Sequence, residues 1–174
     1  MNLDCGKCVV RDWSRSDKAS LLRHANNRNV ARNLTERLPH PYAEADAEAW
    51  FSMLEGMTER THWAIDVGGH AVGGIGCIVG KGVRAKSAAF GYWLGEEFWG
   101  RGIMSAAVQR VAPHVLAHFK LVRLESPVFA SNPVSMRVLE KAGFTREGVH
   151  RCAVVKDGEI IDEVLYALVD RARG

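Results

Sequence analysis

Apolar residues recur along this chain with two periods, and each period predicts one type of secondary structure. After residue 103, apolar side chains return at steps of three and four, which indicates one buried helix face; they are Met104, Val108, Val111, Val115 and Phe119. Ser16 or Asp17 is expected to cap an earlier helix, and Pro113 to kink the long one or end it early. Similar patterns predict further helices over 19–25, 30–34, 43–57 and 133–142.

Runs of apolar or alternating residues, bounded by glycine, proline or charged clusters, predict the strands. They cover residues 8–13, 62–67, 71–79, 88–94, 121–126, 144–155 and 160–169. Gly68-Gly69 and Asp157-Gly158 predict tight hairpin turns. The long helix supplies the crossover that a parallel pairing of 88–94 with 121–126 requires. Pro127 has no backbone donor, so it should mark a strand end or a bulge.

The order of these elements indicates an α+β fold, with a mixed, mostly antiparallel sheet flanked by helices. The 174 residues are expected to form one domain spanning 1–174. A hydrophobic share of 47% and a charged share of 25% are typical of a globular protein in water. The net charge of +3, with scattered basic residues, argues against a nucleic-acid partner. No run suits a membrane span or a signal peptide, so no membrane partner and a cytoplasmic location are expected.

Two short motifs resemble functional sites, but a structural role explains each of them better. Cys5-Gly6-Lys7-Cys8 has the spacing of redox and zinc motifs. A thioredoxin-like site needs a strand before it and a helix after it, and a zinc site needs a second ligand pair. Reduced cysteines and no metal are therefore expected. Gly74-Ile75-Gly76 resembles part of a nucleotide loop, but no helix follows it, so it indicates close backbone packing.

Residues 90–104 combine a strand, a glycine loop and a helix start. Gly100 and Gly102 let the backbone bend sharply and approach a ligand closely. The first turn of the following helix has N–H groups without intrahelical partners and the positive end of the helix dipole, which together bind phosphate groups. Arg101 adds a charged, forked donor. The alternative is that the glycines only form a tight turn, and the sequence further along favours the anion site.

Several motifs follow one another in a fixed order. They are Tyr92-Trp93-Leu94, Trp99-Gly100-Arg101-Gly102-Ile103-Met104, Asn132-Pro133-Val134-Ser135, Lys141-Ala142-Gly143-Phe144, and Asp157-Gly158-Glu159 with Asp162 and Tyr166. This set resembles the GNAT superfamily of acetyl-CoA-dependent N-acetyltransferases, in particular the branch that includes the ribosomal-protein-alanine N-acetyltransferases. The resemblance covers nearly the whole chain. It implies a central sheet that is splayed at the cofactor cleft.

The resemblance also implies a site for acetyl-CoA as cosubstrate, with no metal. The backbone of Tyr92, Trp93 and Leu94 would pair with the pantetheine arm like an added strand. Asn132 and Ser135 would lie near the pantetheine and the thioester sulfur. The family makes a homodimer possible as well. The pyrophosphate would be held by N–H groups of Trp99, Gly100, Arg101, Gly102, Ile103 and Met104.

Direct attack of an amine on the thioester needs close positioning, an oxyanion donor, a base and an acid. A backbone N–H in the strand 92–94 is the expected oxyanion donor. Many relatives place a tyrosine acid where this chain has Leu139, so Ser135 becomes the candidate general acid, directly or through water. A capping serine is the alternative reading of Ser135. The base is unassigned among solvent water and four side chains, Glu125, His150, Asp162 and Glu163.

The expected function is acetyl transfer from acetyl-CoA to a primary amine in a ternary complex. The acceptor is left open between a protein N-terminus and a small-molecule amine. Acceptor contacts are expected from residues 26–42 and the terminal hairpin, with His40, Tyr42 and Asp162 as candidates. One alternative is a non-catalytic acetyl-CoA-binding sensor. A remote one is a nicotinamide-dependent oxidoreductase, because Gly100-x-Gly102-x-x-Ser105 approaches a dinucleotide fingerprint, although only one strand–helix–strand unit is present.

Overall fold

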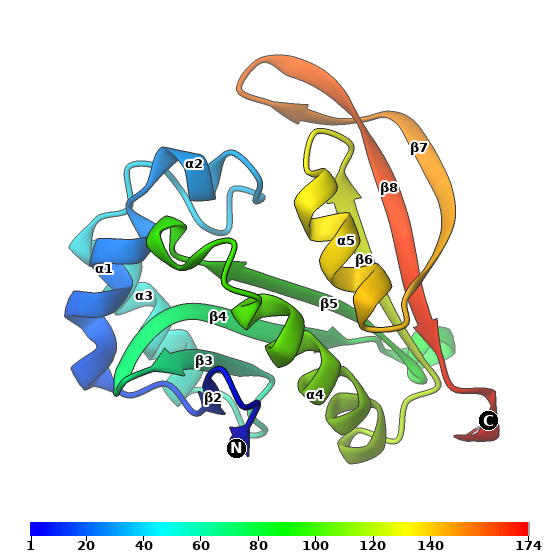
Figure 1. The fold of residues 1–174 in the computed structure, drawn as a ribbon, viewed down its shortest axis with the longest axis horizontal. Coiled ribbons are helices and arrows are strands. Elements are labelled where there is room, and N and C mark those ends of the chain that lie inside the picture. The colour runs from blue at the N-terminus through cyan, green and yellow to red at the C-terminus, as the bar shows by residue number, and fades with distance from the viewer. Residues whose placement is uncertain (174) are drawn as a thin grey trace. The chain divides into compact units, whose positions relative to one another are not determined.

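The computed structural model describes residues 1–173 and shows helices and strands interleaved along the chain (Figure 1). The α-helices are α1 (Lys18–Ala25), α2 (Arg28–Ala31), α3 (Glu44–Glu55), α4 (Ile103–His118) and α5 (Pro133–Lys141). Short 3-10 helices are η1 (Arg15–Asp17), η2 (Gly82–Arg84), η3 (Glu96–Phe98) and η4 (Arg171–Arg173). The strands are β1 (Asn2–Asp4), β2 (Val9–Arg11), β3 (His62–Val67), β4 (His70–Val79), β5 (Ser87–Leu94), β6 (Arg123–Phe129), β7 (Thr145–Lys156) and β8 (Glu159–Val169).

The strands form one mostly antiparallel sheet in the order β1-β2-β3-β4-β5-β6-β8-β7. The exception is the predicted parallel pair, in which Ser87–Ala89 of β5 lies beside Arg123–Glu125 of β6. The predicted fold class is therefore confirmed. Both predicted hairpin turns are present, and at the second one Asp157 and Gly158 have φ values of 52° and 83°. That pair of left-handed residues suits the twist of a two-residue hairpin turn.

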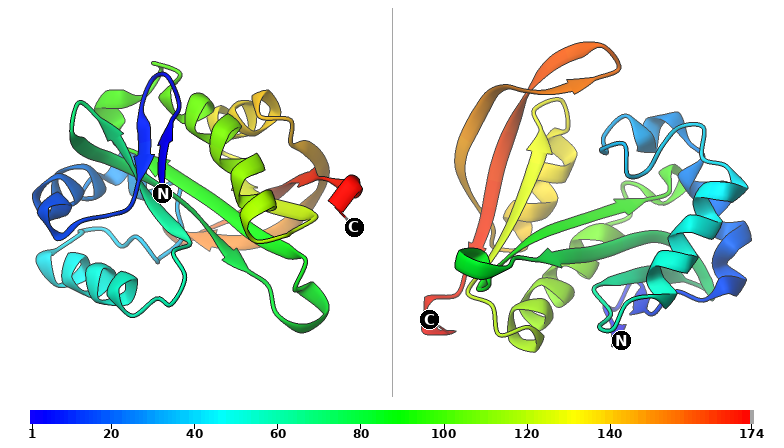
Figure 2. Two further views of the ribbon diagram at one scale, coloured as in Figure 1. Left: turned by 90° about the horizontal axis from the view of Figure 1, so that it is seen from below. Right: turned by 180° about the vertical axis from the view of Figure 1, so that it is seen from behind.

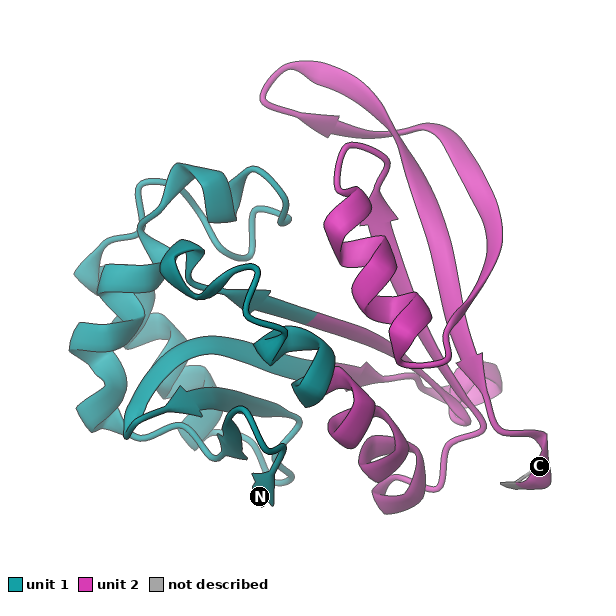
Figure 3. Cartoon of the chain, viewed as in Figure 1, with its two compact units in different colours: residues 1–76, 92–107 teal, residues 77–91, 108–174 magenta. Residues whose placement is uncertain are grey.

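Two compact units are distinguished within the chain (Figure 3). Unit 1 contains residues 1–76 and 92–107, and unit 2 contains residues 77–91 and 108–174. The elements β4, β5 and α4 each contribute residues to both units. Among residues 1–173, no helix is long and apolar enough to cross a membrane.

The core of unit 1 lies where α1 and α3 pack side by side on one face of the sheet (Figure 2). Partly buried Trp13, Trp50 and Trp93 pack against the cluster that these helices form. The predicted glycine packing is confirmed, because a Cβ at Gly74 would lie 2.7 Å from the Trp93 indole nitrogen. The cluster itself consists of Leu21, Ala25, Tyr42, Ala47, Phe51 and Leu54.

In unit 2, α5 covers residues 133–141 of the helix predicted over 133–142. The Asn132 side-chain oxygen accepts from the Ser135 N–H at 3.2 Å, Pro133 is the first helical residue, and Gly143 follows the helix with φ of 86°. Leu139 on the inner face of α5 is fully buried, and Phe144 beyond it stacks on Phe90 with ring centroids 5.9 Å apart. Apolar burial on one face thus holds this helix in place.

Several predicted boundaries were wrong near the N-terminus. The strand predicted over 8–13 is confined to β2, and it pairs with β1, which was not predicted. Asp17 is the N-cap residue of α1, as predicted, but its side chain makes no capping bond there. Ser14 caps the preceding η1 and forms a capping box with Asp17. The helix predicted over 30–34 is instead α2, Arg28–Ala31, because the Asn27 side chain caps it by accepting from two backbone N–H groups.

The predictions of an early helix end at Pro113 and of a strand end or bulge at Pro127 were wrong, whereas a kink at Pro113 stays a prediction. Helix α4 does not end at Pro113 but continues to His118. Strand β6 runs through Pro127, which pairs in regular register with Leu165 of β8. The parallel register of β6 with β5 covers Arg123–Glu125, upstream of Pro127. The missing proline donor therefore falls where the described ladder with β5 has already ended.

Candidate functional site

At the end of β5, in unit 1, successive residues direct their backbone N–H and C=O groups to opposite edges of the strand. An ideal Cβ at Gly73 of β4 would lie 2.4 Å from the Trp93 carbonyl oxygen, and the Gly95 N–H donates to a β4 carbonyl at 2.8 Å. Backbone groups alternate between the two edges of a strand. Trp93 therefore faces β4, while Tyr92 and Leu94 face the opposite edge. Pairing of the 92–94 backbone with pantetheine stays a prediction, and within this segment Tyr92 and Leu94 are the residues whose backbone groups face away from β4.

The strand leads into the predicted glycine loop. The indole nitrogen of Trp99 donates to the Leu94 carbonyl oxygen at 2.7 Å and closes the turn around η3. Gly100 and Gly102 have φ values of 74° and 75°, in the left-handed region that favours glycine. The Gly102 carbonyl accepts the first intrahelical bond of α4, at 3.1 Å from the Ala106 nitrogen. The predicted arrangement of strand, loop and helix start is therefore present.

One charged residue of this loop region was missed by the sequence analysis. Lys7, at the tip of the β1–β2 hairpin, donates from its Nζ to the Arg101 carbonyl oxygen at 3.0 Å. The Arg101 guanidinium itself lies over the Phe98 ring, 5.3 Å from its centroid. Arg101 as a phosphate donor stays a prediction. The loop thus has two cationic side chains beside it.

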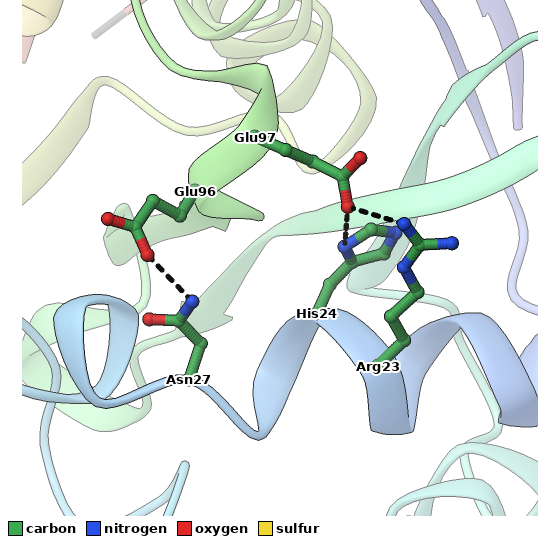
Figure 4. Close-up of a pocket in the computed structure, with 5 residues that line it drawn as sticks. All are labelled: Arg23, His24, Asn27, Glu96 and Glu97. Carbon is green, nitrogen blue, oxygen red and sulfur yellow. Dashed lines mark hydrogen bonds and ion pairs between the residues drawn. The ribbon is translucent and has the colours of Figure 1, made fainter.

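A pocket of about 330 Å³ lies between α1 and η3, also within unit 1 (Figure 4). The Glu96 carboxylate accepts from the side-chain amides of Asn27 and Asn29, each at 2.8 Å. These bonds attach the start of α2 to the turn that precedes the glycine loop. Segment 26–42 is predicted to contact the acceptor, but the carboxylate that bonds to its first residues was not predicted from the sequence. The pocket is lined by Arg23, His24, Asn27, Glu96 and Glu97.

His24 is the buried member of this pocket. Its Nδ1 lies 3.4 Å from a carboxylate oxygen of Glu97, which is also 3.2 Å from Arg23. Burial lowers the pKa of His24, and the nearby Glu97 only partly opposes this effect. A Cβ at Gly95 would lie 2.8 Å from the same imidazole nitrogen. The turn after β5 can therefore approach α1 closely only with glycine at this position.

The acceptor candidates of unit 1 have different environments. Tyr42 is buried in the core cluster, its backbone N–H donates to the Asn26 side chain at 3.1 Å, and burial raises the pKa of its phenol to about 12. His40 is exposed. Roles for Tyr42 and His40 toward an acceptor stay predictions.

In unit 2, the candidate acid lies at the start of α5. Ser135 is half-buried, and its backbone N–H is the group that Asn132 caps. Leu139, one turn further along the helix, is fully buried in the apolar core. The role of Ser135 as an acid stays a prediction.

The four candidate bases of unit 2 divide into two groups. His150 pairs with Glu163 at 3.2 Å, and Asp162 accepts from the Cys152 N–H at 2.8 Å, all near the Phe129 end of β6. Glu125 instead lies near the other end of β6, where it pairs with Arg123 at 3.3 Å. The structure therefore pairs His150 with Glu163 and separates Glu125 from them, while Asp162, the neighbour of Glu163 in β8, points to the other face of the strand.

Comparison with known proteins gives the family of this chain's relatives. Residues 7–145 match the family described as Acetyltransferase (GNAT) domain. The "Probable N-acetyltransferase YjcK" of Bacillus subtilis is 40% identical over 85 residues, which are 49% of this chain and 47% of that protein. The ribosomal-protein-serine acetyltransferase of Escherichia coli is 34% identical over 84 residues, 48% of this chain and 47% of that protein. The chain thus spans about half the length of these curated relatives.

Solved structures support the same fold. The structure of RimL, the ribosomal L7/L12 alpha-N-protein acetyltransferase in complex with Coenzyme A, superposes with a TM-score of 0.87. The superposition covers 99% of both chains, and 21% of the residues are identical. At this identity the likeness shows the fold alone.

Proposed function

Because the chain belongs to the acetyltransferase (GNAT) domain family, we propose that it transfers an acetyl group from acetyl-CoA to a primary amine. The observation that carries the proposal is the loop with Gly100 and Gly102 in the left-handed conformation directly before α4. Such a helix start presents N–H donors and a positive dipole end to an anion. The residues present therefore suit the pyrophosphate of acetyl-CoA.

The proposed reaction is a direct acyl transfer. The amine nitrogen attacks the thioester carbonyl carbon, a C–N bond forms, and the C–S bond breaks as the tetrahedral intermediate collapses. One proton leaves the attacking nitrogen, and the departing thiolate of CoA takes up one. The N–H groups of Tyr92 and Leu94 suit the oxyanion, because they lie on the edge of β5 that faces away from β4.

The proton carriers are proposed from unit 2. Ser135 at the start of α5 is the proposed acid for the thiolate, directly or through one water. The proton of the amine goes to solvent water or to the group that contains His150, Asp162 and Glu163. The His150 imidazole pairs with the Glu163 carboxylate at 3.2 Å, as a base with an orienting partner would, whereas Glu125 pairs with Arg123.

The acceptor class is proposed as an amine on a protein N-terminus or on a small molecule. The names of two relatives mark these two classes. One is the ribosomal-protein-serine acetyltransferase of Escherichia coli, and the other is the L-amino acid N-acetyltransferase AaaT of the same organism, 25% identical over 136 residues. The segment 26–42, whose Asn27 and Asn29 bond to Glu96 of η3, is the proposed acceptor-binding region of unit 1.

The direct test is release of CoA thiol from acetyl-CoA in the presence of single amines. The panel contains peptides with free N-termini, the same peptides with blocked N-termini, polyamines, aminoglycosides and amino acids. We expect turnover with one class and none with the blocked peptides. Binding of acetyl-CoA without turnover on any amine of the panel would instead support the non-catalytic sensor.

A further inference from the structure

The β1–β2 hairpin brings a cation to the start of α4. The Nζ of Lys7 lies 3.0 Å from the Arg101 carbonyl oxygen, and an ideal Cβ at Gly102 would be 2.9 Å from the same nitrogen. Figure 2 shows the hairpin tip beside the first turn of α4. The ammonium therefore lies over the backbone of the proposed phosphate loop.

The hairpin tip is held in place by its own bonds. The Cys5 N–H donates to the Cys8 carbonyl at 2.9 Å, and the Gly6 N–H donates to the Asp4 carboxylate at 2.7 Å. Cys5 and Cys8 are buried, while Lys7 between them is exposed. The cysteine motif thus has a structural use, since its buried side chains anchor the turn that presents Lys7.

The ammonium group of Lys7 lies where the surrounding electrostatics are unfavourable for a positive charge. The start of α4 carries the positive end of the helix dipole, where an ammonium group is unfavourable and an anion is favourable. Among residues 1–173, no carboxylate pairs with Lys7, and its described contact is the neutral Arg101 carbonyl. An ammonium has three donors, so two remain for a further ligand. A bound phosphate would compensate both the ammonium and the dipole.

We propose that Lys7 binds the pyrophosphate of acetyl-CoA directly. The inference rests on the proposed function and adds to it a ligand from outside the glycine loop. Charge-assisted bonds from an ammonium to phosphate oxygens are about twice as strong as neutral ones. Lys7 then supplies charge to the same phosphate groups that receive N–H bonds from the loop.

The test is the affinity for acetyl-CoA, measured by titration calorimetry at low salt. Lys7→Met should weaken binding about tenfold or more, and Lys7→Arg should keep most of the affinity because the charge remains. Lys81→Met is the matched control, because Lys81 is an exposed lysine after β4 and its loss changes the net charge equally. This control should bind as wild type does.

Two analogues identify the phosphate group involved. Acetyl-dephospho-CoA lacks the 3′-phosphate, and S-acetylpantetheine lacks every phosphate. The substitution Lys7→Met should weaken binding of the dephospho analogue as much as it weakens binding of acetyl-CoA. S-acetylpantetheine should bind wild type and Lys7→Met equally. A loss that disappears with the dephospho analogue would assign Lys7 to the 3′-phosphate. An equal loss with acetylpantetheine would show that Lys7 only shapes the loop. Either result would overturn the inference.

A second variant separates this inference from the proposed function. Gly102→Glu places a carboxylate in the loop itself and should abolish acetyl-CoA binding. If Gly102→Glu loses binding while Lys7→Met binds as wild type does, the inference is wrong and the proposed function stands. If both variants bind normally, the loop is not the cofactor site.

Discussion

At the residue scale, a buried charge cluster connects β2 to the start of α1. The Arg11 guanidinium makes two hydrogen bonds to Asp17 and one to Asp66, each at 2.8 Å. Both carboxylates are buried, with 6% and 8% of their surfaces exposed. Removing one partner of such a cluster leaves uncompensated buried charge, which costs more than the loss of an exposed pair.

Arg11→Met should therefore lower the free energy of unfolding by about 3 kcal/mol. Urea denaturation measures the change, and Arg15→Met is the control. Arg15 pairs with Glu48 and Glu55, but all three side chains are about half exposed, so solvent screens these pairs and the loss should be smaller. Equal losses in the two variants would contradict the importance of the buried cluster.

The same cluster predicts a pH dependence. Burial by itself would raise the pKa of Asp17, but the hydrogen bonds from Arg11 and from the Ser14 N–H, together with the charge of Arg11, outweigh it and lower that pKa below its usual value. A carboxyl with a lowered folded-state pKa stabilises the fold above its unfolded pKa of about 3.9 and loses this contribution as the pH falls through the folded pKa. The stability difference between wild type and Arg11→Met should shrink below about pH 4, as urea midpoints across pH would show.

At the element scale, one glycine controls how closely β4 approaches the end of β5, and a second glycine serves as its comparison. A Cβ at Gly73 would lie 2.4 Å from the Trp93 carbonyl oxygen, a backbone atom that can move only with its strand. Gly91 of β5 has nothing within 4 Å of its ideal Cβ. Both glycines lie in strands, so alanine has the same strand propensity at each position. A difference between the two alanine variants therefore measures the steric effect.

Gly73→Ala should cost about 1–3 kcal/mol of stability, as overpacking does, and should weaken acetyl-CoA binding because Tyr92–Leu94 is displaced. Gly91→Ala should change stability by less than about 0.5 kcal/mol. Thermal melts and calorimetric titrations measure both effects. A Gly73→Ala protein as stable as wild type would show that β4 does not constrain this edge.

Glu96 offers a test of the acceptor segment. Its carboxylate holds Asn27 and Asn29 beside η3, so Glu96→Ala should loosen the start of α2 without touching the glycine loop. We expect the KM for the acceptor amine to rise severalfold while the Kd for acetyl-CoA stays unchanged. Glu36→Ala, an exposed carboxylate of the same segment, is the control. A changed acetyl-CoA affinity with a constant acceptor KM would refute this assignment.

Elements whose structure depends only on residues close together in the sequence could be predicted from it. The glycine loop, the Asn132-capped helix and the Asp157-Gly158 turn each depend on a few consecutive residues. Strand β1 was missed because its three residues carry no measurable period. The effect of Pro127 depends on where a neighbouring ladder stops, which only tertiary structure decides.

In the candidate site, too, the local features could be predicted and the long-range contacts could not. The loop of Gly100 and Gly102 was found because its chemistry is local. The contact of Lys7 with Arg101 joins residues 94 positions apart, and the Glu96 bonds to Asn27 and Asn29 join residues 69 and 67 positions apart. No local pattern encodes such pairs.

At the scale of the whole molecule, the two compact units raise the question of cooperativity. The elements β4, β5 and α4 each belong to both units, so neither unit is a continuous stretch of chain. We therefore expect the predicted single domain to unfold in one transition. The five tryptophans, Trp13, Trp50, Trp63, Trp93 and Trp99, all belong to unit 1.

Tryptophan fluorescence therefore reports on unit 1, while far-ultraviolet circular dichroism reports on the helices and strands of both units. The two urea transitions should coincide in midpoint and slope. Separated midpoints would show that the units unfold independently and that the chain contains two folding domains.

The central claim is that the loop before α4 holds acetyl-CoA, and one comparison of affinities tests it most directly. Calorimetric titration of acetyl-CoA would be performed on wild type, Gly102→Glu and Gly82→Glu. Gly82 also has a positive φ, of 58°, and open space around its ideal Cβ, so its variant carries the same charge and a similar backbone strain. The account predicts binding to wild type and Gly82→Glu and none to Gly102→Glu. Equal binding by all three proteins would contradict it.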